Sequence, residues 1–194
     1  MITELKDIRV ILASKSPRRR ELLGQLTPDF EIITAEVDET LPEDTHASLG
    51  VELLAVRKGA AVVDMHRDAL VISSDTLVEL DGIPLGKPCD TADARRMLRS
   101  LSGRSHNVHT GVAVHYRGEV YSGVATTAVV FRELSEREID EYIATGEPMD
   151  KAGSYGIQGK GGALVCEYRG DFDTVVGLSV ELTRRLILAA LEEK

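Results

Sequence analysis

Two long segments of alternating apolar and polar residues constrain the fold of this chain more than any other feature. They are SHNVHTGVAVHY (105–116) and EVYSGVATTAVVF (119–131), and only Arg117-Gly118 separates them. Alternation over such a length is typical of a β-strand, and a two-residue connection that contains glycine is typical of a hairpin. The sequence therefore predicts a long hairpin within a larger sheet.

Patterns of strand and helix alternate on both sides of this hairpin. Strands are expected at 8–11, 30–33, 69–73 and 163–168, and helices after Ser16, at 48–65, at 91–101, after Ser135 and at 179–193. The chain has no internal repeat, no low-complexity tract and no long linker. We therefore expect one α/β domain over residues 1–194, with a mixed sheet and flanking helices.

The charge and composition of the chain exclude several classes of function. The net charge of -9 disfavours a nucleic-acid polymer or an anionic membrane as a partner. Cys89 and Cys166 are too few for a disulfide framework or a cysteine-based zinc site. The N-terminal residues lack the apolar core of a signal peptide, and no apolar run approaches the roughly 20 residues that span a bilayer. We therefore expect a cytoplasmic protein.

A basic turn follows the first expected strand, in the segment LASKSPRRRELL (12–23). Ser16 is a favourable N-cap, and Pro17 suits the first position of a helix. Free backbone amides and the cationic side chains of the turn would converge there, as in a phosphate-binding site. These side chains are Lys15, Arg18, Arg19 and Arg20. The alternative is an ordinary capped helix with a solvated basic face, and this segment alone does not decide between the two.

Four further residues carry groups suited to chemistry on a polyphosphate. Asp75 is expected where the strand 69–73 meets a turn, and a carboxylate there can act as a general base or bind a metal. Lys87, in LGKP (85–88), and Lys58, on an apolar helix, can neutralise phosphate charge. Glu39 adds an oxygen ligand of the kind that magnesium accepts. Each has a plain alternative as a turn cap or a solvated charge, but together they indicate metal-assisted chemistry on a polyphosphate.

The chain resembles the Maf family of nucleoside-triphosphate pyrophosphatases. The matching segments are LASKSPRRRELL, VDE (37–39), SSDTLV, LGKP, LSGRSHNVHTGVAV, EPMDKAGSYGIQGKGG and VVGL (175–178). The resemblance implies an elongated mixed sheet with two lobes around a nucleotide cleft, similar to inosine-triphosphate pyrophosphatases. It also implies hydrolysis of a nucleoside triphosphate to a monophosphate and pyrophosphate, a divalent metal (magnesium or manganese), and the homodimers that are common in the family.

The resemblance also assigns roles to individual residues of the reaction centre. Asp75 matches the proton acceptor that activates the attacking water, and it shares with Glu39 the role of metal ligand. Lys58 and Lys87 match lysines that contact or neutralise the triphosphate, and Lys87 is expected to contribute to catalysis.

Substrate binding is assigned by the same resemblance. Ser14 and Arg18 belong to the phosphate-binding turn, whereas Arg18, Thr76 and Gln158 match positions tied to the choice of nucleotide. Gln158 lies in the glycine-dense loop AGSYGIQGKGG (152–162), which is similar to that of the branch acting on dTTP and UTP. We expect its glycines to let the loop lie close to the base.

Two residues depart from the family pattern. Lys15 stands where a small or neutral residue is usual, so it would add a phosphate contact. Ser179 replaces the proline of GLP, which should loosen the start of the last helix.

Two other functions remain open besides hydrolysis of dTTP and UTP. One is a 7-methyl-GTP pyrophosphatase, which shares the chemistry but not the base pocket. The other is a non-catalytic nucleotide-binding regulator of cell division, which would need no general base.

Overall fold

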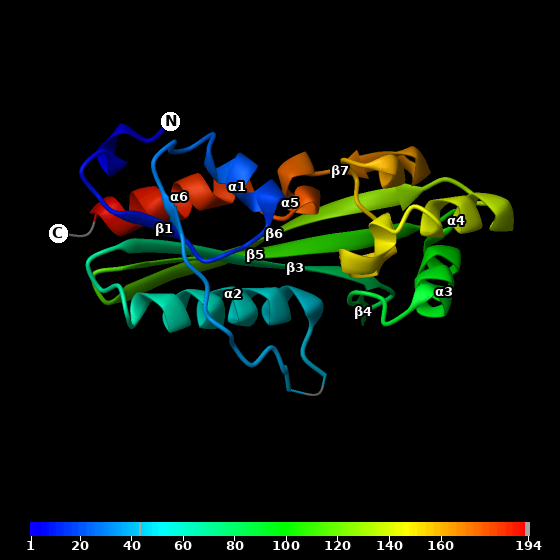
Figure 1. Cartoon of the computed structure of the whole chain (residues 1–194), viewed down its shortest axis with the longest axis horizontal. Helices are drawn as coiled ribbons and strands as arrows, with labels where there is room; N and C mark the ends of the chain where they lie inside the picture. The colour runs from blue at the N-terminus through cyan, green and yellow to red at the C-terminus, as the bar shows by residue number, and fades with distance from the viewer. Residues whose placement is uncertain (43, 193–194) are drawn as a thin grey trace.

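The computed structural model describes residues 1–42 and 44–192, within which seven strands form one sheet (Figure 1). The strand order is β2-β1-β3-β5-β6-β7, and β4 pairs with β3 outside this path. The strands are Val10–Leu12 (β1), Glu31–Ile32 (β2), Leu70–Leu80 (β3), Ile83–Leu85 (β4), Ser105–Tyr116 (β5), Glu119–Phe131 (β6) and Val165–Arg169 (β7). β1 pairs in parallel with β2 and β3, whereas the other pairs are antiparallel. The predicted mixed sheet is confirmed.

Helices cover both faces of the sheet and one of its ends. The α-helices are Pro17–Leu23 (α1), Ala47–Val63 (α2), Thr91–Leu101 (α3), Glu136–Ile143 (α4), Phe172–Val176 (α5) and Val180–Glu192 (α6). Short 3-10 helices are Thr3–Leu5 (η1), Glu147–Asp150 (η2), Ala152–Ser154 (η3) and Lys160–Leu164 (η4). Figure 1 shows α2 along one face, α1, α5 and α6 along the other, and α3 and α4 at the far end of the hairpin. Within the described residues, none of these helices is both long and apolar enough to cross a membrane.

Two apolar clusters lie at opposite ends of the long strands β3 and β5. The first packs Leu70 and Ile72 of β3 beneath α1 and α6, and the second packs Val78 and Leu80 beneath α3 and α4. Between these two clusters, β3 carries the polar run Ser73–Thr76. Each end of the sheet therefore has a core of its own, which confirms the expected two lobes and leaves a polar strip between them.

The predicted hairpin is present with the expected boundaries. β5 and β6 pair in register from Tyr116 opposite Glu119 to Ser105 opposite Val130. The connecting residues Arg117 and Gly118 have φ angles of 53° and 90°. Positive φ at both central residues is the signature of a type I′ turn, whose twist matches that of the flanking strands. The two strands of the hairpin are the longest of the sheet, and they pair with β3 on one side and β7 on the other.

The prediction that the strand before Asp75 ends at that residue is wrong. β3 continues to Leu80, pairs with β5 as far as Glu79, and turns back into β4 through Asp81 and Gly82. Asp75 therefore lies in the middle of a strand. The strand that ends here is its neighbour β1, whose pairing with β3 stops where Leu12 lies opposite Ile72.

Three of the α-helices begin at a residue whose side chain caps the first turn. Ser16 and Asp90 accept hydrogen bonds from amides of the first turns of α1 and α3, and Ser135 forms a capping box with Glu138. The expected loosening at Ser179 is wrong, because its hydroxyl accepts a hydrogen bond from the Leu182 amide (3.3 Å) and caps α6. The predicted strand at 30–33 is reduced to the exposed pair Glu31–Ile32, and the predicted last residue of α6, at 193, lies outside the described residues.

Candidate active site

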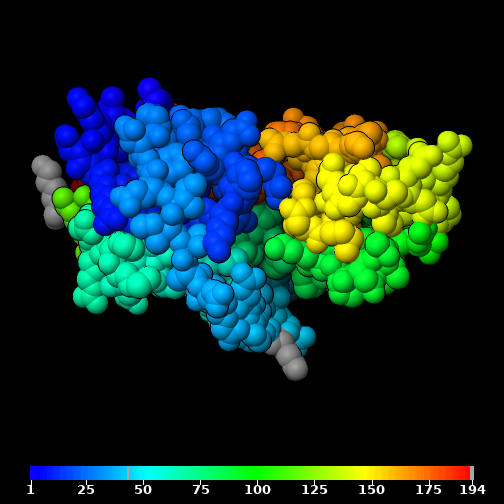
Figure 2. Space-filling view, in the orientation of Figure 1, coloured from blue at the N-terminus to red at the C-terminus, as the bar shows by residue number. Residues whose placement is uncertain are grey.

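The polar strip of β3 forms the floor of a cleft of about 1380 Å³ between the two lobes. The edge of β3 is open from Ser73 to Leu77, because β1 pairs only as far as Ile72 and β4 begins to pair at Val78. Figure 2 shows the surface hollowed between the blue N-terminal residues and the yellow residues near position 150. The predicted site residues all line this cleft: Ser14, Arg18, Glu39, Lys58, Asp75, Thr76, Lys87 and Gln158.

The basic turn after β1 is held together by Arg19, a residue that the sequence did not single out. The Arg19 guanidinium donates hydrogen bonds to the carbonyl oxygens of Ser74 (2.7 Å) and Gly177 (2.9 Å). It also lies 3.4 Å from both the Ser14 and Thr76 hydroxyls. Burial of this guanidinium lowers its pKa, and the negative charge of Asp75 opposes that effect. Arg19 therefore anchors the turn to the strand that carries Asp75.

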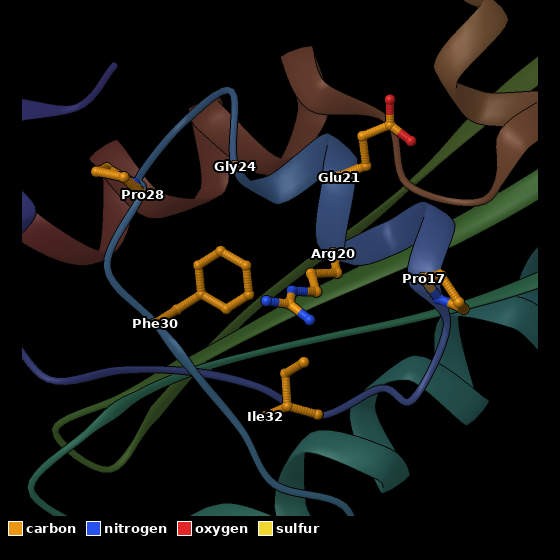
Figure 3. Close-up of a pocket in the computed structure, with 7 residues that line it drawn as sticks. All are labelled: Pro17, Arg20, Glu21, Gly24, Pro28, Phe30 and Ile32. Atoms are coloured by element: carbon orange, nitrogen blue, oxygen red, sulfur yellow. The ribbon is translucent and has the colours of Figure 1, made fainter.

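The two neighbouring arginines point in different directions. Arg18 lines the cleft, with its guanidinium 4.0 Å from the Asp150 carboxylate of the opposite lobe. Arg20 instead points into a separate, shallower pocket of about 510 Å³ behind α1, toward Phe30 and Ile32 (Figure 3). Of the three consecutive arginines, Arg18 and Arg19 face the cleft, and Arg18 has the freer side chain.

Lys58 lies between the two carboxylates of the predicted reaction centre. Its ammonium nitrogen is 2.5 Å from Asp75 Oδ1 and 2.8 Å from Glu39 Oε1. Asp75 is 9% exposed, whereas Glu39 belongs to the loop between β2 and α2 and is more exposed. The hydrogen bond from Lys58 lowers the pKa of Glu39, and burial of Glu39 opposes it. Three residues far apart in the sequence thus form one compact charged group.

Close packing of α2 on the sheet brings Lys58 to Asp75. A Cβ atom at Gly59 would lie 2.4 Å from the ring of His115, and a Cβ atom at Gly111 would lie 2.3 Å from the Val51 carbonyl oxygen. Real side chains do not tolerate such contacts, so both positions require glycine. Gly111 pairs directly with Asp75 across β3 and β5, which places the closest helix contact beside the carboxylate.

The second lobe contributes Lys87 and the glycine-dense loop to the cleft. Lys87 follows β4 and is exposed on the cleft wall, and its charge adds to the lowering of the pKa of Glu39 by the Lys58 hydrogen bond. The Gly86 carbonyl accepts a hydrogen bond from the Gly153 amide (3.0 Å), which ties the Lys87 turn to the loop. The two segments therefore form one wall.

Thr76 and Gln158 approach the cleft in different ways. The Thr76 hydroxyl lies 2.9 Å from that of Thr110, which in turn donates to the Thr174 carbonyl (2.7 Å). Thr76 is thus held by its neighbours. The side chain of Gln158 is exposed and makes no hydrogen bond to any other described residue, so its amide is free toward the cleft.

Two glycines of the loop are explained by close contacts with Glu147 of η2 and Tyr142 of α4. A Cβ atom at Gly159 would lie 2.4 Å from Glu147 Oε1, and one at Gly161 would lie 2.5 Å from the Tyr142 hydroxyl. The expected approach of these glycines to a base stays a prediction. Their contacts within the protein already require them.

Comparison with known proteins agrees with this arrangement. The model of the Maf-like protein family matches residues 9–190. The chain belongs to the Maf family. The "dTTP/UTP pyrophosphatase" proteins of Bacillus cytotoxicus and Bacillus cereus are each 47% identical to it over 179 residues, which cover 92% of this chain and 94% of theirs.

Two solved structures also match part of this Maf chain. The Ham1 protein of Staphylococcus aureus is 18% identical, with a TM-score of 0.49, and the match covers 63% of this chain and 71% of that protein. A HAM1 protein from Coxiella burnetii is 16% identical, with a TM-score of 0.46, and the match covers 64% and 73% of the two chains.

The donor set around Lys58 fits a magnesium-type ion. Glu39 and Asp75, on two separate segments, each direct one carboxylate oxygen toward the Lys58 ammonium, and each has a second oxygen. Among residues 1–42 and 44–192, no group of three or more His, Cys, Asp and Glu side chains forms a closed metal cage. Magnesium is commonly held by one or two carboxylates together with water and substrate phosphates. Two carboxylates beside a basic turn match that requirement.

Sequence reasoning missed three residues that line the cleft of this Maf protein. Arg19 could not be told from its neighbours, because consecutive arginines carry no sign of which one is buried. Asp150 and Lys151 lie in the quoted segment EPMDKAGSYGIQGKGG but were not selected. Lys151 forms an ion pair with Asp150, and its ammonium also donates to the Glu147 carbonyl (3.4 Å). The adjacent opposite charges of Asp150 and Lys151, directly before a glycine-rich loop, were the sequence signal that could have indicated both residues.

Proposed function

We propose that this chain hydrolyses dTTP and UTP to the nucleoside monophosphate and pyrophosphate in the cleft between its lobes. The observation that carries this proposal is the group formed by Asp75, Lys58 and Glu39 beside the basic turn. A phosphate binder needs the cations alone, whereas a hydrolase also needs a carboxylate close to the phosphates. The 47% identical relatives named dTTP/UTP pyrophosphatase support the same assignment.

The triphosphate would bind across the two lobes. The turn at Ser14 offers a hydroxyl and nearby backbone amides, and Arg18 extends from the same lobe toward Asp150. Lys87 reaches into the cleft from the opposite lobe. Such preorganised donors and cations stabilise the charge that develops as the phosphoanhydride bond breaks.

Asp75 would act as the proton acceptor for the attacking water. Its Oδ1 atom is fixed by the Lys58 ammonium, and the rigid pairing of β3 with β5 fixes its backbone. The water oxygen would bond to the α-phosphorus while Asp75 takes the proton. The bond between the α-phosphorus and the oxygen that bridges to the β-phosphate would break, and pyrophosphate would leave with that oxygen.

Glu39 and Asp75 would also hold a divalent cation such as magnesium or manganese, which neutralises phosphate charge when it is bound. We expect Glu39→Gln to raise the magnesium concentration needed for half-maximal activity about tenfold or more, because one anionic ligand is lost. A magnesium titration of dTTP hydrolysis measures this change, with Asp44→Asn, an exposed residue of the same loop that does not line the cleft, as the control. Full activity in excess chelator, or an unchanged magnesium requirement in Glu39→Gln, would contradict the assignment.

The base is proposed to be read by the Gln158 amide, which can both donate to a pyrimidine carbonyl and accept from its N–H. Cytosine presents an amino group where the uracil ring presents a carbonyl. We therefore expect Gln158→Ala to narrow the ratio of kcat/KM for UTP over CTP about tenfold, the value of roughly one hydrogen bond. Steady-state kinetics with both nucleotides measure the ratio, and Lys160→Ala on the same loop serves as the control. An unchanged ratio in Gln158→Ala would remove Gln158 from the base pocket.

A panel of nucleotides tests the proposed substrate class. The assay compares kcat/KM for dTTP, UTP, CTP and 7-methyl-GTP with magnesium or manganese. The proposal expects dTTP and UTP to be the preferred substrates. Preference for 7-methyl-GTP would favour the related pyrophosphatase, and tight binding of nucleotides without turnover would favour a regulatory protein.

A further inference from the structure

The carboxylate of Glu147 lies at the centre of the glycine-dense loop. Its Oε1 atom accepts hydrogen bonds from the Tyr142 hydroxyl (3.0 Å) and the Gly161 amide (3.1 Å). Its Oε2 atom accepts a hydrogen bond from the Lys160 amide (3.0 Å). One side chain from η2 therefore holds two consecutive backbone amides of the loop and one hydroxyl of α4.

The loop is held in this way on both sides of Gln158. The buried Tyr142 hydroxyl that donates to Glu147 also accepts a hydrogen bond from the Gly156 amide (3.1 Å). Glu147 and Tyr142 thus fix the residue two positions before Gln158 and the residues two and three positions after it. Gln158 lies at the tip of this segment, and its side chain is exposed to the cleft.

The packing leaves the loop little room for another arrangement. Gly159, next to Gln158, has so little space that a Cβ atom there would lie 2.5 Å from Glu147 Oε2. Burial raises the pKa of Glu147, but the Gly161 and Lys160 amides, the Tyr142 hydroxyl and the charge of Lys151 together lower it, so the group carries its charge at neutral pH. A charged acceptor makes stronger hydrogen bonds to backbone amides than a neutral one does.

From these contacts, we propose that Glu147 is a positioning residue that sets the choice of pyrimidine by holding Gln158 in place. Glu147 lines the cleft, but its carboxylate oxygens are engaged by the Tyr142 hydroxyl and the loop amides, so it acts through the backbone of the loop. The inference rests on the proposed function, because it concerns how that activity selects its base. An incorrectly placed amide would favour uracil over cytosine less strongly.

The test compares Glu147→Gln with the wild-type protein. Glutamine has nearly the same shape, but its amide nitrogen is a donor and cannot accept from a loop amide. We expect the ratio of kcat/KM for UTP over CTP to narrow about tenfold, while kcat for UTP changes less than threefold. Amide hydrogen exchange at Lys160 and Gly161 should accelerate. The matched control is Glu141→Gln, which removes an exposed carboxylate of α4 that pairs with Arg137 outside the cleft.

A second variant separates positioning from a general loss of stability. Tyr142→Phe keeps the buried ring and removes only the hydroxyl that holds Glu147 and Gly156. We expect it to narrow the UTP over CTP ratio in the same direction. Accelerated exchange of the loop amides with an unchanged ratio in both variants would overturn the inference. If the wild-type protein cleaves neither UTP nor dTTP, the proposed function fails, and the exchange data alone then report whether Glu147 orders the loop.

Discussion

Asp75→Asn is expected to lower kcat for dTTP by a factor on the order of 10²–10⁴, the usual contribution of a general base. Asparagine has nearly the same shape as aspartate but cannot accept a proton from water. Its oxygen can still accept the hydrogen bond from Lys58, and the pairing of β3 with β5 does not depend on the carboxylate. The fold should therefore persist, and single-turnover kinetics measure the loss in the chemical step.

Asp64→Asn is the matched control, because it removes an exposed carboxylate at the end of α2 and should leave kcat unchanged. Thermal unfolding of both variants shows whether the sheet is intact. A folded Asp75→Asn protein that retains near-normal kcat would show that another group accepts the proton.

Lys58→Met is expected to produce the second large effect. It removes the ammonium that pairs with Asp75 and Glu39, so both carboxylates lose the partner that orients them and the cleft loses one cation. We expect kcat/KM for dTTP to fall by a factor on the order of 10². Methionine keeps the length and apolar stem of the side chain, so α2 should still pack against the sheet.

The same substitution changes the titration of Glu39. The hydrogen bond from Lys58 lowers the pKa of Glu39 in the folded protein, so this contact stabilises the fold above the ordinary pKa of a glutamate. That stabilisation is lost as the pH falls through the lowered pKa. In Lys58→Met the pKa should rise toward its usual range, which carbon NMR of the Glu39 carboxyl measures. Lys6→Met, at an exposed position, is the control, and an unchanged Glu39 pKa in Lys58→Met would contradict the contact.

The strands could be predicted where local sequence decides them. The hairpin 105–131 was predicted with its boundaries, because alternation and an Arg-Gly turn are local signals. The end of β3 was misplaced because the cleft opens where its neighbour β1 stops, and strand pairing is not encoded in the residues around Asp75. The predicted position of Asp75 at the end of a strand was therefore wrong, although Asp75 does lie on the floor of the cleft.

The candidate site was likewise predicted only in part. Motifs placed all eight predicted residues around one cleft, but they could not distinguish the buried Arg19 from Arg18. The sequence also gave no sign that Lys58 contacts both Asp75 and Glu39, because these contacts join a helix, a strand and a loop. Two of the glycines that were expected to approach a base, Gly159 and Gly161, pack closely against Glu147 and Tyr142 instead. Long-range packing accounts for each of these differences.

Identification of the products by phosphorus NMR tests most directly whether the protein hydrolyses dTTP to dTMP and pyrophosphate. The wild-type protein is incubated with dTTP and magnesium, and the phosphorus signals are followed until the substrate is consumed. We expect dTMP and pyrophosphate in equal amounts, with no accumulation of dTDP. Formation of dTDP and inorganic phosphate, or the absence of any cleavage, would contradict it.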